Sequence, residues 1–276
     1  TKSKIISKLT DITNQKSLKK LFKKHNIDIV YHAAAYKHVN ILENEIEAAV
    51  NNNIFGTYYL VQECLKNNIN NLVMISTDKA VDPSTIMGVT KKFCELIVIN
   101  CNKINKNNNY SSVRFGNVFN SSGSVIQIFK KQIEEENNLT LTDPNVTRFF
   151  MSTDEAVSLV LKASTISKGG EIFVLDMGRP IKILDIAKKM IHLSGNSIKS
   201  ESNPDGDIGI DIIGLQKGEK LHEILSKDDI IKTIKNMQKF AVLTFYFSKV
   251  NLYLDKKDLE SAKKICKKEL GDLKID

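Results

Sequence analysis

The chain has 276 residues, 42% of them hydrophobic, which excludes a mainly disordered protein and leaves room for one large α/β domain with at most a small appendage. Its 40 Lys and Arg exceed its 32 Asp and Glu, but the lysines are spread along the chain and no basic block is interleaved with aromatic residues. Compositional bias explains the net charge of +8 better than a nucleic-acid-binding patch does, and a basic protein suits an anionic substrate.

The cysteines and the apolar stretches indicate the compartment. Neither C-x-x-C spacing nor partner histidines accompany the four cysteines, Cys64, Cys94, Cys101 and Cys266. They are predicted to be reduced and structural, with no metal and no disulfide. The sequence has no signal peptide, and its longest apolar stretch, residues 240–247, is too short to span a bilayer. We therefore expect a soluble chain of cytoplasmic character.

Short apolar runs alternate with amphipathic segments, which is the pattern of a parallel sheet built from βα units. The predicted strands are residues 27–32, 71–76, 111–115 and 171–176. The predicted helical segments are residues 43–67, 86–105, 125–136, 154–167 and 183–194. The polar residues 102–109 are expected to form the frayed end of a helix and a surface turn.

The beginning of the chain lacks a motif that such a fold needs to hold a dinucleotide. No glycine precedes Gly56, so the G-x-G-x-x-G phosphate loop is missing. Residues 4–13 are predicted to be the third strand of the fold and the turn after it. In the strand order 3-2-1-4-5-6, the first two strands would then be absent, leaving a gap of roughly 14 Å at ~4.8 Å per strand. We expect an N-terminally incomplete, Rossmann-like doubly wound sheet rather than a new fold.

The segment ISTDKAVDPSTIMGVTK carries the main chemical signal. Thr77, Asp78 and Lys79 directly follow a predicted buried strand, where open α/β sheets bind their ligands. Ten residues past Thr77, a helix places Met87 and Lys91 four apart and therefore on one face. This spacing resembles the Ser/Thr…Tyr-x-x-x-Lys site of the extended short-chain dehydrogenases/reductases, with Met87 at the tyrosine position.

Further stretches occur in the order and spacing of one family's motifs. They are HAAAYKH (32–38), NNNIFGT (51–57), RFGNV (114–118), TDP (142–144), TRFF (147–150), GEIFVLDMG (170–178) and GLQKGEK (214–220). With the Thr-Asp-Lys triplet, they resemble the polysaccharide-biosynthesis (CapD-like) UDP-N-acetylglucosamine 4,6-dehydratases. Each stretch alone is weak, but their order and spacing, from about residue 5 to 225, are specific.

The resemblance implies an NAD-dependent (rather than NADP-dependent) nucleotide-sugar 4,6-dehydratase acting on UDP-N-acetylglucosamine or a related UDP-hexosamine. The implied catalytic residues are Thr77, Asp78, Lys79, Met87 and Lys91. The implied cofactor-binding residues are Asp11, Ile12, Ala33, Ala34, Ala35, Asn53 and Lys91. The implied substrate-binding residues are Lys37, Asn117, Arg148, Lys217 and Lys220.

The resemblance also implies an organisation and a setting. Residues 1–135 are expected to form a partial NAD-binding domain that carries the catalytic segment, and residues 136–227 a substrate-binding part with interleaved sheet elements. Residues 228–276 leave the family pattern and have no assigned role. A homo-oligomer without nucleic acid is expected, and a full-length protein anchored at the cytoplasmic face of a membrane, because long relatives carry a transmembrane region before the cofactor domain.

In the implied reaction, C4 of the sugar is oxidised, water is eliminated across C5 and C6, and the stored hydride returns to C6. Lys79 is the candidate base for the C5 proton and Asp78 the candidate acid for the 6-hydroxyl. Their adjacent opposite charges favour Asp⁻ and Lys⁺, the wrong forms for those roles, so burial would have to disfavour both charges. The roles could also exchange with Lys91 or a water.

Two departures from the family pattern keep alternatives open. Met87 has no titratable proton and so cannot take the part of a tyrosine. It marks either a dehydrogenase that has lost its activity or a subfamily that uses another base, and the intact residues Thr77, Asp78, Lys79 and Lys91 favour the subfamily. Gln216 stands where the family usually has an arginine, which removes one expected diphosphate contact. A UDP-sugar epimerase on the same scaffold and a non-catalytic nucleotide-binding remnant are the rival functions.

Overall fold

The structure, a computed structural model, describes residues 4–104 and 107–226. The chain divides into two units, Thr1–Leu225 and Ser226–Asp276. Apart from Ser226, the second unit lies outside the described residues. Cys266, the apolar stretch 240–247 and the predicted extension 228–276 therefore lie outside them too. No helix in the described part is long and apolar enough to cross a membrane.

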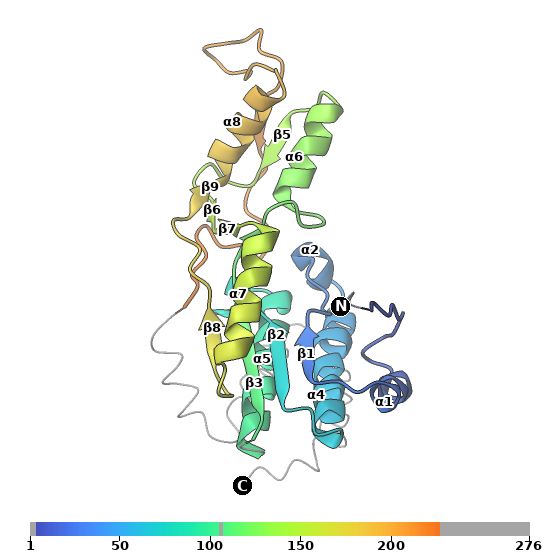
Figure 1. Cartoon of the computed structure of the whole chain (residues 1–276). Helices are drawn as coiled ribbons and strands as arrows, with labels where there is room; N and C mark the ends of the chain where they lie inside the picture. The colour runs from blue at the N-terminus through green and yellow to red at the C-terminus, as the bar shows by residue number, and fades with distance from the viewer. Residues whose placement is uncertain (1–3, 105–106, 227–276) are drawn as a thin grey trace. The chain divides into compact units, whose positions relative to one another are not determined.

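A four-stranded parallel sheet forms the centre of the first unit (Figure 1). Its order is β1 (Ile29–His32), β2 (Asn71–Ile75), β3 (Asn109–Arg114) and β8 (Ile172–Val174). All neighbours are parallel, so all carboxyl ends lie at one edge of the sheet. The four strands predicted from the apolar runs are confirmed, each within a few residues of its expected bounds.

Helices cover both faces of this sheet. On one face lie α1 (Gln15–Lys24), α4 (Gly56–Lys66) and α5 (Ile86–Ile104); on the other lies α7 (Thr153–Ile166). Side chains of β2 alternate accordingly, because Leu72 and Met74 pack under α4 and α5, while Val73 packs toward α7. Each fully buried side chain of this kind contributes about 1.5–3 kcal/mol of transfer free energy. The predicted doubly wound arrangement is confirmed.

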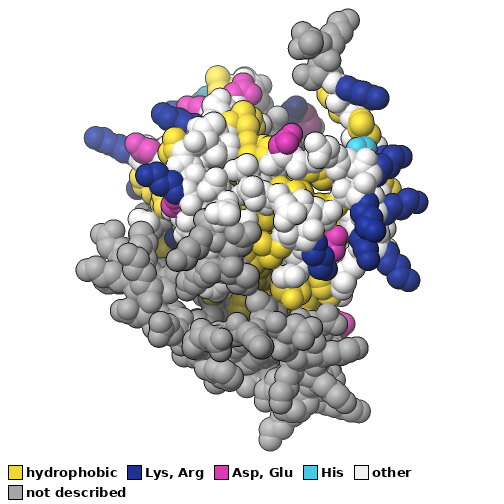
Figure 2. Space-filling view, turned by 60° about the horizontal axis from the view of Figure 1, so that its bottom comes forward, with side chains coloured by type: hydrophobic (Ala, Val, Ile, Leu, Met, Phe, Trp, Pro, Cys, Tyr) yellow, Lys and Arg dark blue, Asp and Glu magenta, His cyan; other side chains and the backbone are white. Residues whose placement is uncertain are grey.

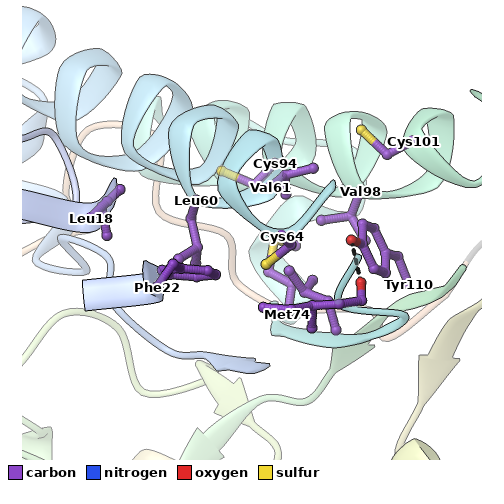
Figure 3. Close-up of a cluster of buried hydrophobic side chains, with 12 residues drawn as sticks. Leu18, Phe22, Leu60, Val61, Cys64, Met74, Cys94, Val98, Cys101 and Tyr110 are labelled. Atoms are coloured by element: carbon purple, nitrogen blue, oxygen red, sulfur yellow. Dashed lines mark hydrogen bonds between the residues drawn. The ribbon is translucent and has the colours of Figure 1, made fainter. Parts of the chain in front are cut away.

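Figure 3 shows the core between α4, α5 and the sheet. Tyr110 is fully buried there and donates a hydrogen bond of 2.7 Å to the carbonyl of Ile69. Cys64, Cys94 and Cys101 are buried free thiols in the same core. Burial raises the pKa of Cys64 and of Cys101 to about 12. The reactive thiolate is therefore disfavoured at these positions, as is typical of structural cysteines.

A second layer of elements packs around its own core beyond the carboxyl edge of the sheet (Figure 1). It comprises α6 (Val125–Glu134), β5 (Leu139–Leu141), α8 (Ile183–Leu193) and β10 (Ile210–Ile212). Two-residue strands pair around it, namely β4 (Asn117–Val118) with β7 (Phe150–Met151), and β6 (Thr147–Arg148) with β9 (Ile181–Lys182). The helices were predicted, but the two-residue strands were not, because so few residues show no alternation. The division into domains at residues 135 and 227 stays a prediction.

The prediction of a strand within residues 4–13 is wrong. These residues form no helix or strand, and their apolar side chains are exposed, with Ile5 at 88% and Leu9 at 107%. A strand needs a neighbour for its N–H and C=O groups, and within the described residues β1 pairs only with β2. The chain becomes regular only at α1, whose Leu18 and Phe22 are buried in the core.

Much of the positive charge of the first unit lies on its surface. Helix α1 carries five lysines on the side opposite its buried residues. In the face shown in Figure 2, many Lys and Arg side chains gather along one side, and others lie among hydrophobic, uncharged and acidic side chains on the rest of the described surface. The amphipathic pattern of α1 thus explains part of the net positive charge as a solvated helix face.

Candidate active site

The end of strand β2 carries three of the predicted catalytic residues. After Ile75 the chain continues beside β3, because Ser76 N donates to Val113 O at 2.7 Å and Asp78 N donates to Phe115 O at 3.1 Å. A short 3-10 helix, η2 (Asp78–Ala80), then turns the chain. These backbone bonds hold Thr77, Asp78 and Lys79 at the carboxyl edge of the sheet, where ligands of open α/β sheets bind.

Asp78, Lys79 and Glu223 form a group that we call the Asp78 cluster, in which both acids are buried and Lys79 is half-buried. Asp78 Oδ1 accepts hydrogen bonds from Thr77 Oγ1 at 2.9 Å and from Lys79 Nζ at 3.0 Å. Glu223 Oε1 lies 3.8 Å from the same Lys79 Nζ. Asp78 is fully buried and Glu223 is 8% exposed, yet Asp78 Oδ2 and Glu223 Oε2 have no hydrogen-bond partner among the described residues. The ammonium of Lys79 therefore lies between two carboxylates that each keep one oxygen available.

Gly116 makes room for this cluster. A Cβ atom placed there would lie 3.1 Å from Asp78 Oδ2 and equally close to Phe149. Any side chain at this position would therefore press on the carboxylate. The stretch RFGNV thus contributes space for Asp78 as well as Asn117 itself.

Helix α5 brings Lys91 to the same strand end. Lys91 Nζ donates a hydrogen bond of 2.5 Å to the carbonyl of Ile75, and burial lowers the pKa of this lysine. Met87, one turn earlier, is 5% exposed and packs with Leu42, Ala49 and Ile86. Met87 thus occupies an apolar environment, while Lys91 lies directly behind the residues that follow β2.

Asn53 ties the loop after β1 to helix α5. It lies in a π-helix, η1 (Val50–Phe55), a form that often occurs at functional sites. Its Oδ1 accepts from Tyr36 N at 2.7 Å, and its Nδ2 donates to Tyr36 O and to Thr90 Oγ1, both at 3.0 Å. With Asn52 Nδ2 also donating to Oδ1 at 3.0 Å, the amide has no capacity left for a ligand. Its contribution in this structure is to position the loop.

The loop after β1 presents small side chains to solvent. Ala33 and Ala34 are exposed and Ala35 is half-buried, while Lys37 is exposed. Below them, His32 is buried, and its Nε2 is 2.8 Å from Thr57 Oγ1. Burial, with the nearby charge of Lys91, lowers the pKa of His32 to about 3, so its imidazole is neutral at pH 7.

The two N-terminal residues with a predicted cofactor role make local contacts. Asp11 Oδ1 accepts hydrogen bonds of 2.8 Å from the backbone N and the hydroxyl of Thr13, which lower the pKa of Asp11. Ile12 packs against Gly56, where an added Cβ would come within 2.6 Å of Ile12 Cδ1. Both residues therefore have roles in shaping the start of α1 and α4.

These residues fit one end of a nicotinamide dinucleotide. The small side chains after β1 allow close approach of a ring, and Lys91 with Thr77 offers polar groups beside it. The pyrophosphate end would need a glycine loop at a helix N-terminus, and no glycine precedes Gly56 in this sequence. The fit is therefore to the nicotinamide and its ribose.

A cavity of about 290 Å³ opens in front of the Asp78 cluster. This volume is at the lower end of the ~300–1,000 Å³ typical of small-molecule sites. Lys79 lies on its wall together with elements of the second layer. The other polar side chains of the wall include Asn117, Arg148, Gln216, Glu219, Lys220 and Glu223. The cavity wall thus brings one predicted catalytic residue, Lys79, together with three predicted substrate-binding residues, Asn117, Arg148 and Lys220. The other predicted catalytic residues lie outside this wall, as do Lys37 and Lys217.

Two predicted substrate contacts are held by the protein itself. Arg148 is 7% exposed, and its guanidinium donates to Glu219 Oε1 at 2.8 Å and to the carbonyl of Thr147 at 2.8 Å. Lys220 Nζ donates to the carbonyls of Val81 at 2.9 Å and Asp82 at 2.6 Å. Lys220 therefore fastens its own segment to the turn that follows η2.

Sequence reasoning missed Glu219 and Glu223. Glu219 lies inside the GLQKGEK stretch. A buried arginine such as Arg148 needs a carboxylate partner, and that need could have pointed to this glutamate. Glu223 lies just beyond that stretch, and nothing local distinguishes it from a surface glutamate. Only the folded chain places it near Lys79.

A second buried group, which we call the Glu95 cluster, lies behind the strand ends. Glu95 Oε1 accepts from Ser76 Oγ at 2.7 Å and from Arg114 Nε at 2.6 Å, and Oε2 accepts from Arg114 Nη2 at 2.7 Å and from Lys92 Nζ at 3.4 Å. Glu95 is fully buried, and Arg114 and Lys92 are 3% and 7% exposed. This cluster clamps β2, β3 and α5 together.

Comparison with known proteins shows consistent similarity. The family described as "Polysaccharide biosynthesis protein" matches residues 1–244. The capsular polysaccharide biosynthesis protein CapD of Staphylococcus aureus is 44% identical over 80% of this chain and 36% of its own length. A UDP-N-acetylglucosamine 4,6-dehydratase (inverting) of Campylobacter jejuni is 35% identical over 79% of this chain and 62% of its own length. A UDP-glucose 4-epimerase of Rickettsia canadensis is 35% identical over 80% of this chain and 62% of its own length.

A solved structure agrees with the sequence relatives. The X-ray structure of Pen from Bacillus thuringiensis has a TM-score of 0.72 at 35% identity, over 80% of this chain and 66% of that one. The chain spans 36% of the length of CapD and 62% of the length of the dehydratase and of the epimerase. The similarity therefore covers most of this chain but only part of each of those relatives.

Proposed function

Because the chain belongs to the polysaccharide biosynthesis protein family, we propose that it carries the catalytic segment of an NAD-dependent 4,6-dehydratase acting on UDP-N-acetylglucosamine or a related UDP-hexosamine. The observation that carries the proposal is the Asp78 cluster, with Lys79 on the wall of a cavity at the carboxyl edge of the sheet. Adjacent acid and base groups at this place match the two proton transfers that elimination across C5 and C6 requires.

Thr77 and Lys91 would hold a nicotinamide, which would supply the hydride chemistry at C4 and C6 of the sugar. The protein's own part is proton transfer. Oxidation at C4 acidifies the hydrogen at C5, and Lys79 Nζ takes that proton. Asp78 delivers a proton to the 6-hydroxyl, which leaves as water. These two steps require a neutral amine and a carboxylic acid, so a proton first passes from the Lys79 ammonium to the Asp78 carboxylate across their 3.0 Å contact.

The proton of the 4-hydroxyl needs a different acceptor. At the position where the wider superfamily has a tyrosine, this chain has Met87, which is buried among Leu42, Ala49 and Ile86. A thioether is only a weak hydrogen-bond acceptor. We therefore take Met87 as the mark of a subfamily in which a group other than this side chain accepts the proton of the 4-hydroxyl.

One alternative has support from the comparisons. The Rickettsia canadensis UDP-glucose 4-epimerase is as similar to this chain as the Campylobacter jejuni dehydratase, at 35% identity each. A 4-epimerase moves a hydride only at C4 and needs no acid at C6. Asp78, buried with an unpartnered oxygen next to Lys79, favours the dehydratase because an epimerase would have no use for it.

Solvent hydrogen distinguishes the two reactions. The product of the whole reading frame would be incubated with UDP-N-acetylglucosamine in D₂O and the products examined by NMR. We expect a 4-keto-6-deoxy sugar with deuterium at C5, none transferred to C6, and no net NADH. An epimerase would place no deuterium on carbon and would keep the 6-hydroxyl. A 6-deoxy product that retained its original C5 hydrogen would rule out the mechanism drawn around Lys79.

A further inference from the structure

We propose that Glu223 is a substrate-contacting residue, whose carboxylate accepts a hydrogen bond from a hydroxyl group of the hexose and holds that sugar against Lys79. The proposal rests on the proposed function in one respect, namely that the cavity takes a nucleotide sugar. It adds a residue from the distant end of the described chain to the site formed after β2.

The hydrogen bonding of Glu223 is incomplete. Its side chain lines the cavity, is 8% exposed, and has one oxygen 3.8 Å from Lys79 Nζ. The other oxygen, Oε2, is buried without a hydrogen-bond partner among the described residues. An ionised carboxylate only accepts hydrogen bonds, and leaving a buried acceptor unsatisfied is unfavourable. A donor from outside the chain, bound in the cavity, would satisfy it.

The backbone around Glu223 is held independently of Lys79. Thr147 N donates to Leu221 O at 3.0 Å, and Thr147 Oγ1 is 2.9 Å from His222 Nδ1. On the preceding side, Lys220 Nζ is bonded to two backbone carbonyls of the turn after η2. The carboxylate is therefore presented to the cavity by a segment whose three preceding residues are anchored, which is the support that a binding group requires.

The surrounding charges favour a neutral donor. Lys79 from the end of β2 lies 3.8 Å from Glu223, and Asp78 is paired with that lysine. Arg148 from β6, and Glu219 and Lys220 from the segment of Glu223, line the same cavity. Arg148 is paired with Glu219 at 2.8 Å. The ammonium of Lys79 already lies between the carboxylates of Asp78 and Glu223, so a cationic ligand group has no place there.

An anionic group would be repelled by Glu223, so the diphosphate lies away from it. The ligand group at Glu223 must donate a hydrogen bond and must carry no charge. A sugar hydroxyl group does both. The arrangement therefore orients the nucleotide sugar, with its hexose at Glu223 and Lys79.

Binding calorimetry on the product of the whole reading frame tests this assignment. UDP and UDP-N-acetylglucosamine would each be titrated into wild type, Glu223→Leu and Glu223→Gln. We expect Glu223→Leu to bind UDP as wild type does, but UDP-N-acetylglucosamine about 10- to 100-fold more weakly, the range for losing a hydrogen bond to a charged group. Glu223→Gln keeps the shape and one acceptor, so we expect a smaller loss, about tenfold or less. It also covers the case in which Glu223→Leu does not fold.

The control is Glu135→Gln, which makes the same chemical change at an exposed glutamate whose ion-pair distance to Lys131 is 3.7 Å. It should bind both ligands as wild type does. Equal binding of UDP-N-acetylglucosamine by wild type and both Glu223 variants would overturn the proposal, as would equal affinity of wild type for the two ligands. Binding can be measured without turnover, so the two proposals can fail separately. If the wild-type protein made no 6-deoxy product, the dehydratase function would be refuted. A loss of binding for UDP-N-acetylglucosamine but not for UDP in the Glu223 variants would still support the role of Glu223.

Discussion

The Glu95 cluster and the Asp78 cluster lie on either side of the end of β2, and they differ in how completely their charges are hydrogen-bonded. Both oxygens of Glu95 accept hydrogen bonds from Ser76, Lys92 and Arg114. In the Asp78 cluster, each carboxylate has one buried oxygen without a partner in the described part of the chain. The carboxylates of both clusters are buried, so burial of the acid alone does not distinguish them.

This difference indicates that the Glu95 cluster stabilises the fold, whereas the Asp78 cluster serves activity. A buried carboxylate whose acceptors are all used is committed to its partners and holds elements together. A buried carboxylate with an unused oxygen beside a cavity is unfavourable for the folded chain, unless a ligand or a proton completes it. The comparison predicts that changes in the Glu95 cluster act mainly on stability, and changes in the Asp78 cluster mainly on activity.

The largest effect is expected for the Asp78 cluster. Lys79→Ala and Asp78→Asn should each lower the rate of 4-keto-6-deoxy product formation by about 10²–10⁴, because loss of a general acid or base typically costs that much. Product formation by NMR with the whole reading-frame product would measure this. Near-normal turnover in either variant would remove that residue from its assigned role and weaken the distinction between the clusters.

A matched pair of substitutions tests the stability side. Glu95→Gln removes the charge that pairs with buried Arg114, and breaking one partner of a buried pair typically costs about 3–5 kcal/mol of unfolding free energy. Glu223→Gln, with one oxygen unpartnered and the other 3.8 Å from Lys79, should cost less than about 1 kcal/mol by the same reasoning. Urea unfolding of both variants gives the two values. Equal losses would contradict the comparison.

The pH dependence of the free energy of unfolding tests whether buried His32, at the end of β1, stays uncharged in the folded protein. Burial is the main cause that lowers the pKa of His32 from its ordinary value of 6.5 to about 3 in the folded protein. Below pH 6.5 the unfolded chain binds a proton that the folded chain does not, so stability falls as the pH falls. The loss from this one group should reach roughly 3 kcal/mol near pH 4.5. Urea unfolding between pH 7 and 4.5 should show this loss of unfolding free energy in wild type, whereas His32→Gln should lose about 3 kcal/mol less. An identical pH dependence in the two proteins would mean that His32 accepts a proton in the folded state.

The smallest effect on turnover is expected for Met87→Tyr. Met87 packs in an apolar cluster with Leu42 and Ile86, and it does not line the cavity. A larger side chain there should lower stability by about 1–3 kcal/mol through overpacking, without raising the rate as much as tenfold. Product formation and thermal unfolding of the variant check both expectations. A gain of tenfold or more would show that the methionine had replaced a needed phenol.

Sequence reasoning succeeded where the signal is local. The apolar run before Thr77 predicted β2, and the helical spacing of Met87 and Lys91 predicted α5, because strand and helix periodicities are set by neighbouring residues. It failed for residues 4–13, which were predicted to be a strand although no strand among the described residues pairs with them. It also missed β6 and β9, whose two residues each pair only through tertiary contact.

The amino-acid sequence by itself determined the parallel α/β sheet and the position of Thr77, Asp78 and Lys79 at its carboxyl edge, because each depends on patterns within one βα unit. Only the tertiary structure decided which buried charges are satisfied. Glu95 meets Arg114, and Glu223 meets Lys79, across separations in the chain that no local pattern encodes. A hydrogen bond requires two groups at about 3 Å, and packing of the distant segments sets that distance.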